Sequence, residues 1–157
     1  MNTQQNATTV VAVTEKEFRD GVMPRAQLSK MASEIAIEKT TQKDVKQFAG
    51  WELMEATTVI NVLEDLETTA LPMSKDAEAF VEKLRSLGGK EFDKEYMAAE
   101  LSNHEFLRDL AKNYIDGVDE KLLGNEKETL HVASLALFAF TEHIGLCKKI
   151  SAELNTN

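Results

Sequence analysis

The residues of this chain that could do chemistry are acidic and histidine side chains on otherwise apolar helical faces. In segment 92–115, a turn of about 100° per residue places Glu100 and His104 inside a broad apolar arc. They lie one helical turn apart, so they can hydrogen-bond each other or converge on a third group. One interpretation is a partly solvated pair that satisfies its own hydrogen bonds. The other is a ligand-binding site.

The segment 44–69 adds carboxylates to this set. Glu52 lies on the centre line of its apolar face, and Glu55 is displaced toward one edge. An ionised carboxylate in a helix seam costs several kcal/mol when it has no partner. Glu52 therefore needs a cation, a metal, a histidine or a raised pKa.

The last apolar segment, 126–154, carries a histidine near the centre of its face. A single histidine there is more often a core residue with its hydrogen bonds satisfied than a ligand. His143, however, can meet the inward glutamates of the other segments. Glu142 lies at the edge of the same face and is, with Glu55, a secondary candidate. The sequence thus proposes one interior cluster of Glu52, Glu100, His104 and His143.

Carboxylates and imidazoles together suit iron, manganese or zinc. A di-iron centre in a helical bundle needs a Glu from each of two helices and a Glu-x-x-His from each of the other two. The sequence has only one Glu-x-x-His, Glu128 to His131, at the start of a segment and off its apolar face. The pattern therefore indicates at most an incomplete di-metal site or a site for a single divalent ion.

The elements that must position these residues are helices. Four long segments have an apolar repeat of three and four residues, and a shorter one lies between the second and third: 15–39, 44–69, 75–87, 92–115 and 126–154. Long helices with short connections favour an antiparallel four-helix bundle. The expected architecture is all-α, with an additional short helix and with residues 14–157 as one domain after a flexible polar lead, 1–13.

Three local details complete this prediction. Thr14 and Glu17 form a capping box at the start of the first helix. Pro24 predicts a bend in that helix, or a break into two pieces. The apolar repeat places two sets of side chains inward: Leu28, Met31, Ala32, Ile35 and Ala36 on the first helix, and Val132, Leu135, Ala136, Ala139, Leu146, Cys147, Ile150 and Leu154 on the last.

Composition excludes several classes of protein. The chain has 157 residues, 43% of them hydrophobic, and a formal net charge of −9, which disfavours nucleic acid and anionic lipid as partners. The single cysteine, Cys147, excludes an internal disulfide and a cysteine-rich zinc site. We expect no transmembrane segment, because no apolar run approaches about 20 residues. The N-terminus does not have the regions of a signal peptide.

Three stretches, IAIEKTTQKDVKQFA, LRSLGGKEFDKEYMAAELSNHEFLRDL and FTEHIGLCKKI, give the chain a family resemblance. It resembles a ferritin-like family of mostly exported bacterial proteins that is defined by a domain of unknown function, DUF4142. The resemblance covers about 23–150 and implies a four-helix bundle with an added short helix, located in the periplasm or cell envelope. A cytoplasmic location stays open.

The resemblance also implies positions for the family's polar residues. The family histidines on the third and fourth long helices match His104 and His143. An Asp-His pair of the family matches Glu55 and Ala56, so the acid is kept and the histidine is lost. An acidic residue of the first helix matches Gln27, which carries no charge. These differences argue against a complete family metal site.

Three functions remain open at this point. The first is a non-catalytic bundle with a structural, stress-related or partner-binding role, assembling with itself or with a helical partner through the last helix, whose Leu137, Phe138 and Phe140 widen the apolar surface. The second is a metal-binding or redox bundle. The third is a bundle that holds a lipid or small apolar ligand between its helices. An enzyme is the least supported class, because no catalytic motif is present.

Overall fold

The computed structural model describes residues 13–118 and 124–156, and all regular structure within them is α-helical. The helices are α1 (Glu15–Lys39), α2 (Lys43–Asp65), α3 (Lys75–Ser86), α4 (Gly89–Asp116) and α5 (Asn125–Thr156). The predicted all-α class is confirmed, with the five expected helices in the expected order. The polar lead at 1–13 and a helical turn expected between Gly117 and Gly124 lie almost wholly outside the described residues.

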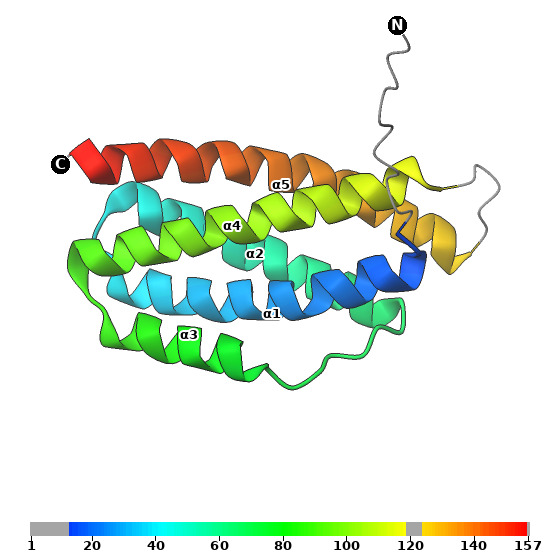
Figure 1. Ribbon diagram of the computed structural model, residues 1–157, viewed down its shortest axis with the longest axis horizontal. Helices are drawn as coiled ribbons and strands as arrows, with labels where there is room; N and C mark the ends of the chain where they lie inside the picture. Colours follow the sequence, from blue (N-terminus) through cyan, green and yellow to red (C-terminus); the bar gives the residue numbers. More distant parts are fainter. Residues whose placement is uncertain (1–12, 119–123, 157) are drawn as a thin grey trace, which may run out of the picture.

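The four long helices lie side by side along the long axis of the molecule (Figure 1). Helix α1 is antiparallel to α2, and α4 is antiparallel to α5. Helix α1 also packs on α4. Because α2 and α4 run in the same direction, the chain must return along the bundle between them. The short helix α3 makes this return and packs on the outside against α1. The four-helix bundle with one additional helix is therefore confirmed.

The first helix begins at the predicted capping box and continues through its proline. The hydroxyl of Thr14 accepts a hydrogen bond from the Glu17 N–H at 3.1 Å, and the Glu17 carboxylate accepts one from the Thr14 N–H at 2.8 Å. Pro24 lies inside α1 without breaking it. The alternative of two helical pieces is wrong, because buried Val22, Met23 and Ala26 on both sides of the proline pack against the bundle and hold the flanking turns in place.

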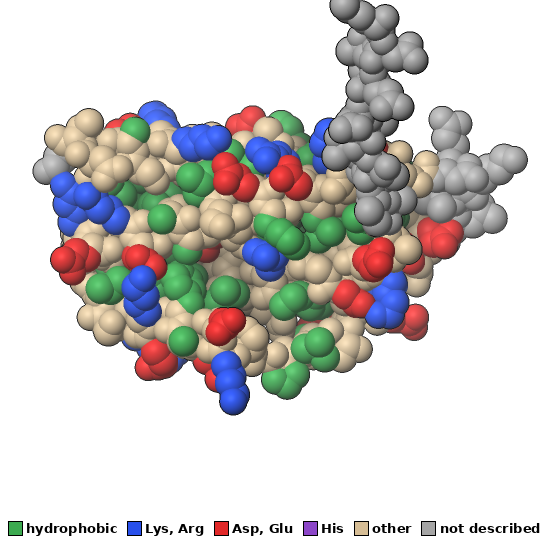
Figure 2. All heavy atoms as spheres, viewed as in Figure 1, with side chains coloured by type: hydrophobic (Ala, Val, Ile, Leu, Met, Phe, Trp, Pro, Cys, Tyr) green, Lys and Arg blue, Asp and Glu red, His purple; other side chains and the backbone are tan. Residues whose placement is uncertain are grey.

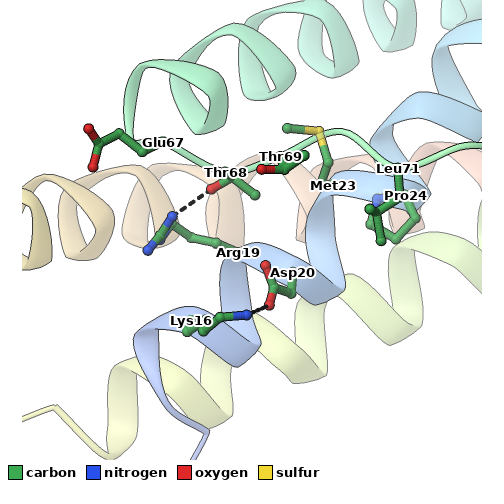
Figure 3. A pocket seen from close by; sticks show the side chains of 9 residues that line it. All are labelled: Lys16, Arg19, Asp20, Met23, Pro24, Glu67, Thr68, Thr69 and Leu71. Atoms are coloured by element: carbon green, nitrogen blue, oxygen red, sulfur yellow. Dashed lines mark hydrogen bonds and ion pairs between the residues drawn. The ribbon is translucent and has the colours of Figure 1, made fainter.

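The segment that joins α2 to α3 is attached to α1 by a half-buried arginine. Arg19 donates hydrogen bonds to the Leu66 carbonyl at 2.8 Å and to the Thr68 hydroxyl at 2.7 Å. Figure 3 shows these side chains around a surface hollow of about 340 Å³, beside the ion pair of Lys16 and Asp20. The hydrogen bonds of Arg19 thus anchor the return segment to α1.

The buried faces of α1 and α5 are rotated from the predicted ones. On α1 the buried positions include Ser29 and Ser33, whereas Leu28 and Met31 are only half-buried. On α5, Leu135 is 71% exposed, contrary to the prediction that it points inward. The reason is that α5 packs mainly on α4, which centres its buried face on Ala133, Ala136, Phe140, Ile144 and Cys147.

Helix α5 also changes one expectation about membranes. It contains an 18-residue window with a mean hydropathy of 1.4, so by length and composition it could cross a bilayer, contrary to our expectation from the sequence. The charged residues of α5 lie mostly near its two ends, which leaves the middle apolar. A core helix of a bundle passes the same test, and one such helix is weak support for a membrane span.

Candidate metal centre

Four side chains from three helices converge in the interior of the bundle. Glu52 and Glu55 come from α2, His104 from α4 and His143 from α5, and one ligand atom of each lies within 4.8 Å of all the others. Glu52 Oε2 is 2.8 Å from His143 Nδ1 and 3.0 Å from His104 Nε2. The two imidazole nitrogens are 3.3 Å apart. This spacing is that of donor atoms around a single ion.

Local helical geometry places the two acids together. Glu52 and Glu55 are three residues apart on α2, so their side chains are neighbours on one face. Glu55 Oε2 is 3.0 Å from His143 Nδ1, and Glu55 Oε1 is 3.6 Å from His104 Nε2. The side chains of Glu52 and His104 are almost wholly buried, whereas Glu55 and His143 retain slight exposure on the α2–α5 side.

The tautomer of His104 is set by the backbone of its own helix. Its Nδ1 lies 2.7 Å from the Glu100 carbonyl oxygen, which can only accept a hydrogen bond. The proton of a neutral ring is therefore on Nδ1, and the lone pair of Nε2 points toward Glu52. A hydrogen bond from the second ring nitrogen to a carbonyl is the usual way in which proteins orient a metal-binding histidine.

Protons or a cation must hold the four groups together, because in their basic forms all four present lone pairs to the same point. Burial alone would raise the pKa of Glu52, but attraction to His104 and hydrogen bonds from both histidines outweigh it and hold the pKa well below the ordinary value. Burial alone would likewise lower the pKa of His143, but Glu52 and Glu55 raise it to about 9. Burial would also lower the pKa of His104, but Glu52, Glu55 and Glu100 outweigh this effect and raise it.

The charges of the cluster match a divalent ion. Without a metal, two imidazolium groups neutralise the two carboxylates of Glu52 and Glu55. One divalent cation bound to two neutral imidazoles would neutralise the same two carboxylates equally well. Even with His143 protonated, its Nδ1–H is bonded to Glu52, so the buried Glu55 Oε2 has no hydrogen-bond donor of its own. An orphaned carboxylate oxygen at the centre of the cluster fits a metal ligand.

A serine and a third carboxyl support the cluster from the α1 side. The Ser29 hydroxyl lies 2.6 Å from Glu52 Oε1 and 2.7 Å from Glu100 Oε2. A hydroxyl has only one proton and cannot donate to both oxygens. Glu100 must therefore be protonated and donate to Ser29, which donates to Glu52. Burial and the charge of Glu52 raise the pKa of Glu100 to about 8, in agreement with this assignment.

The structure sorts the predicted site residues into three groups. Glu52, His104 and His143 lie together in the bundle interior, and the secondary candidate Glu55 lies with them. Glu100 is buried beside the cluster, with its carboxylate 3.6 Å from His104 Nδ1, and it acts through Ser29. Glu142 is exposed and lies outside the cluster, because one residue along a helix turns a side chain by about 100°.

Sequence reasoning missed Ser29, although a signal was present. Ser29 and Ser33 occupy positions between Ala26, Ala32 and Ala36 at the spacing of a buried helical face. Small side chains at this spacing allow close approach of a neighbouring helix, and a hydroxyl among them needs a polar partner. The apolar repeat instead points to the larger Leu28 and Met31 as buried residues.

The four possible ligand atoms lie close enough together to hold a single ion. With bonds of about 2.0–2.1 Å, a tetrahedral zinc site has ligand atoms roughly 3.4 Å apart. Five contacts between possible ligand atoms run from 2.8 Å to 3.6 Å, with different Glu55 oxygens facing the two histidines. One atom from each of the four residues lies within 4.8 Å of the others. Four protein ligands would fill a tetrahedral site and leave no open position for a substrate.

Comparison with known proteins gives a single match. Residues 1–134 match the model of a domain of unknown function, DUF4142. This match includes Glu52, Glu55 and His104 and ends before His143. The family resemblance inferred from the sequence covers a different range, about 23–150. No curated protein and no solved structure matches the chain.

Proposed function

The chain belongs to the DUF4142 family, and we propose that it is a non-catalytic helical bundle that binds one divalent transition-metal ion. The ligands are Glu52, Glu55, His104 and His143, and Zn²⁺ is the ion that the tetrahedral set of nitrogen and oxygen donors fits best. Iron and manganese are the alternatives. The carrying observation is the convergence of four ligand atoms within 4.8 Å in the bundle interior.

The role of this ion is structural in the proposal. The ligands join α2, α4 and α5, and Ser29 adds α1 through its hydrogen bond to Glu52. A metal that binds only the folded chain stabilises it by mass action. A closed set of four protein ligands leaves no position for substrate, which favours a stabilising or storage role over catalysis.

Metal analysis of protein purified without a histidine tag tests the proposal. We expect wild type to bind about one equivalent of Zn²⁺ and the double variant His104→Ala, His143→Ala to bind none. The matched control is His131→Ala, which removes an exposed histidine of α5 and should leave the stoichiometry unchanged. Equal metal content in wild type and the double variant would refute the site.

A second role, partner binding, is favoured by a separate surface. Trp51 and Met54 of α2 and Leu135 and Phe138 of α5 are 44%, 63%, 71% and 65% exposed. A groove of about 280 Å³ runs between the two helices at Trp51, Met54 and Leu135. Exposed apolar side chains gathered on one face are typical of an interaction site. The family resemblance supports a place for both roles in the bacterial cell envelope.

A further inference from the structure

A cavity that none of the four proposed metal ligands lines lies between α1, α3 and the segment that joins α2 to α3. Its volume is about 650 Å³, within the range of sites for small molecules. The walls are mainly apolar and include Leu28, Met31, Leu71, Pro72, Met73 and Phe80. Figure 2 shows the molecule from the side of α1 and α3, where hydrophobic side chains form patches among scattered charged ones.

One end of this cavity carries a guanidinium group without an acidic partner. The chain has four arginines, all described, and Arg19, Arg85 and Arg108 each pair with a carboxylate. Arg25 lines the cavity and pairs with none among the described residues. In a chain with a net charge of −9, an arginine left without a carboxylate is an exception.

The guanidinium of Arg25 is also held in a defined position. Its carbon Cζ lies 3.6 Å from the centre of the Phe106 ring, and Nη1 donates to Asn103 Oδ1 at 3.1 Å. Stacking and one hydrogen bond orient the group while leaving most of its five N–H donors free. A preorganised guanidinium binds a carboxylate with two parallel hydrogen bonds.

We propose that this cavity binds a small monocarboxylate with an apolar body, such as a medium-chain fatty acid. The carboxylate binds Arg25 and Asn103, and the chain lies along Met31, Met73 and Phe80. A second cavity of about 220 Å³ shares Arg25, Asn103 and Phe80 with the first and extends the space for the head group. This second cavity is also lined by Ser29 and Glu100, so it reaches the groups that support the metal cluster from the α1 side.

Charge selects a monoanion over a phosphate ester. Arg25 is the only cationic residue that lines the large cavity, and Asp76 lines it too. A dianionic phosphate would meet one cation and one repelling carboxylate, inside a molecule that is itself negatively charged. A neutral alcohol of the same length would leave the guanidinium without its partner. The carboxylate with an apolar chain satisfies both ends of the cavity.

Calorimetric titration of the full chain with decanoate at neutral pH tests the proposal. We expect micromolar binding to wild type, and affinity at least about tenfold lower for Arg25→Met, because a charge-assisted pair is lost. Arg108→Met is the matched control, since Arg108 lies on α4, pairs with Asp109 and does not line the cavity. It should bind decanoate as wild type does.

A second variant and three other ligands separate the contribution of the apolar wall to binding from that of the charged head group. Met73→Asp, in the wall, should weaken decanoate binding even if Arg25→Met folds poorly. Acetate, decanol and decyl phosphate should each bind at least about tenfold more weakly than decanoate. No heat of binding at millimolar decanoate would overturn the proposal. So would equal affinity of Arg25→Met and wild type, or equal affinity for decanol and decanoate.

Discussion

At the scale of single residues, the geometry of the candidate metal centre depends on the Ser29 hydroxyl proton as well as on the four possible ligands. Glu52 can present Oε2 to both histidines because Oε1 is bound by Ser29. Ser29 in turn requires a proton on Glu100, so a buried acid outside the proposed ligand set still sets the orientation of Glu52. Such supporting groups commonly affect metal affinity about as strongly as weak ligands do.

Replacement of Ser29 by Ala should lower the Zn²⁺ affinity by about 10–100-fold without removing a ligand. Glu52 would lose the donor that orients it, and Glu100 would lose its acceptor. Ser33→Ala is the control, because Ser33 is equally buried one turn further along α1 and bonds to the Tyr96 hydroxyl at 2.8 Å. Competition titration with a zinc indicator gives both affinities. An equal loss in the two variants would contradict the role of Ser29.

At the scale of elements, the seam between α2 and α5 differs from the other helix contacts. The Leu135 and Phe138 side chains of α5 and the Trp51 and Met54 side chains of α2 stay exposed beside a groove. Only one acidic residue, Glu55, lines that groove, and it belongs to the metal cluster. Since two copies with a charge of −9 repel each other, this nearly uncharged face is where a second copy could approach.

We expect wild type to form a concentration-dependent dimer through this seam and Leu135→Glu to remain a monomer. Leu71→Glu is the matched control, because Leu71 is 66% exposed but lies on the segment between α2 and α3. Sedimentation velocity measures the association. Fluorescence of Trp51, the single tryptophan, should shift to the blue as the seam is buried. A wild type that stays monomeric into the upper micromolar range would refute the prediction.

At the scale of the whole molecule, stability and metal binding are linked through protons. The raised pKa values of His143, about 9, and Glu100, about 8, mean that the folded chain without metal favours the protonated forms. Their contribution to stability is complete below the ordinary values of 6.5 and 4.5 and is lost as pH rises through the folded values. Glu52 has a lowered pKa, so its contribution to stability has the opposite pH dependence: it is present at neutral pH and is lost only in acid.

The melting temperature of the metal-free protein should therefore fall between pH 6 and pH 9, by roughly 5–10 °C. With Zn²⁺ the fall should be smaller, because the ion replaces the imidazole protons and binds more tightly as they leave, while Glu100 still titrates. Thermal unfolding across this pH range, with and without a chelator, measures both curves. Glu142→Gln, an exposed neighbour of His143, should leave them unchanged. A metal-free curve that is flat or rises with pH would contradict this assignment.

The sequence by itself determined the helices, their order and the acidic and histidine residues on their apolar faces. This was possible because a helix repeats every 3.6 residues, so local spacing reveals which side chains share a face. The capping box at Thr14 and Glu17 and the inward positions of Glu52, His104 and His143 all follow from such local rules.

Only the tertiary structure decided which edge residues enter the site. A difference of one residue turns a side chain by about 100°, and the rotation of each helix about its axis depends on how large side chains pack across several neighbours. That packing brought Glu55 in, left Glu142 in solvent and placed Ser29 between two carboxyl groups. It also brought Arg25 to a cavity formed by α3, a relation between distant segments that no local repeat contains.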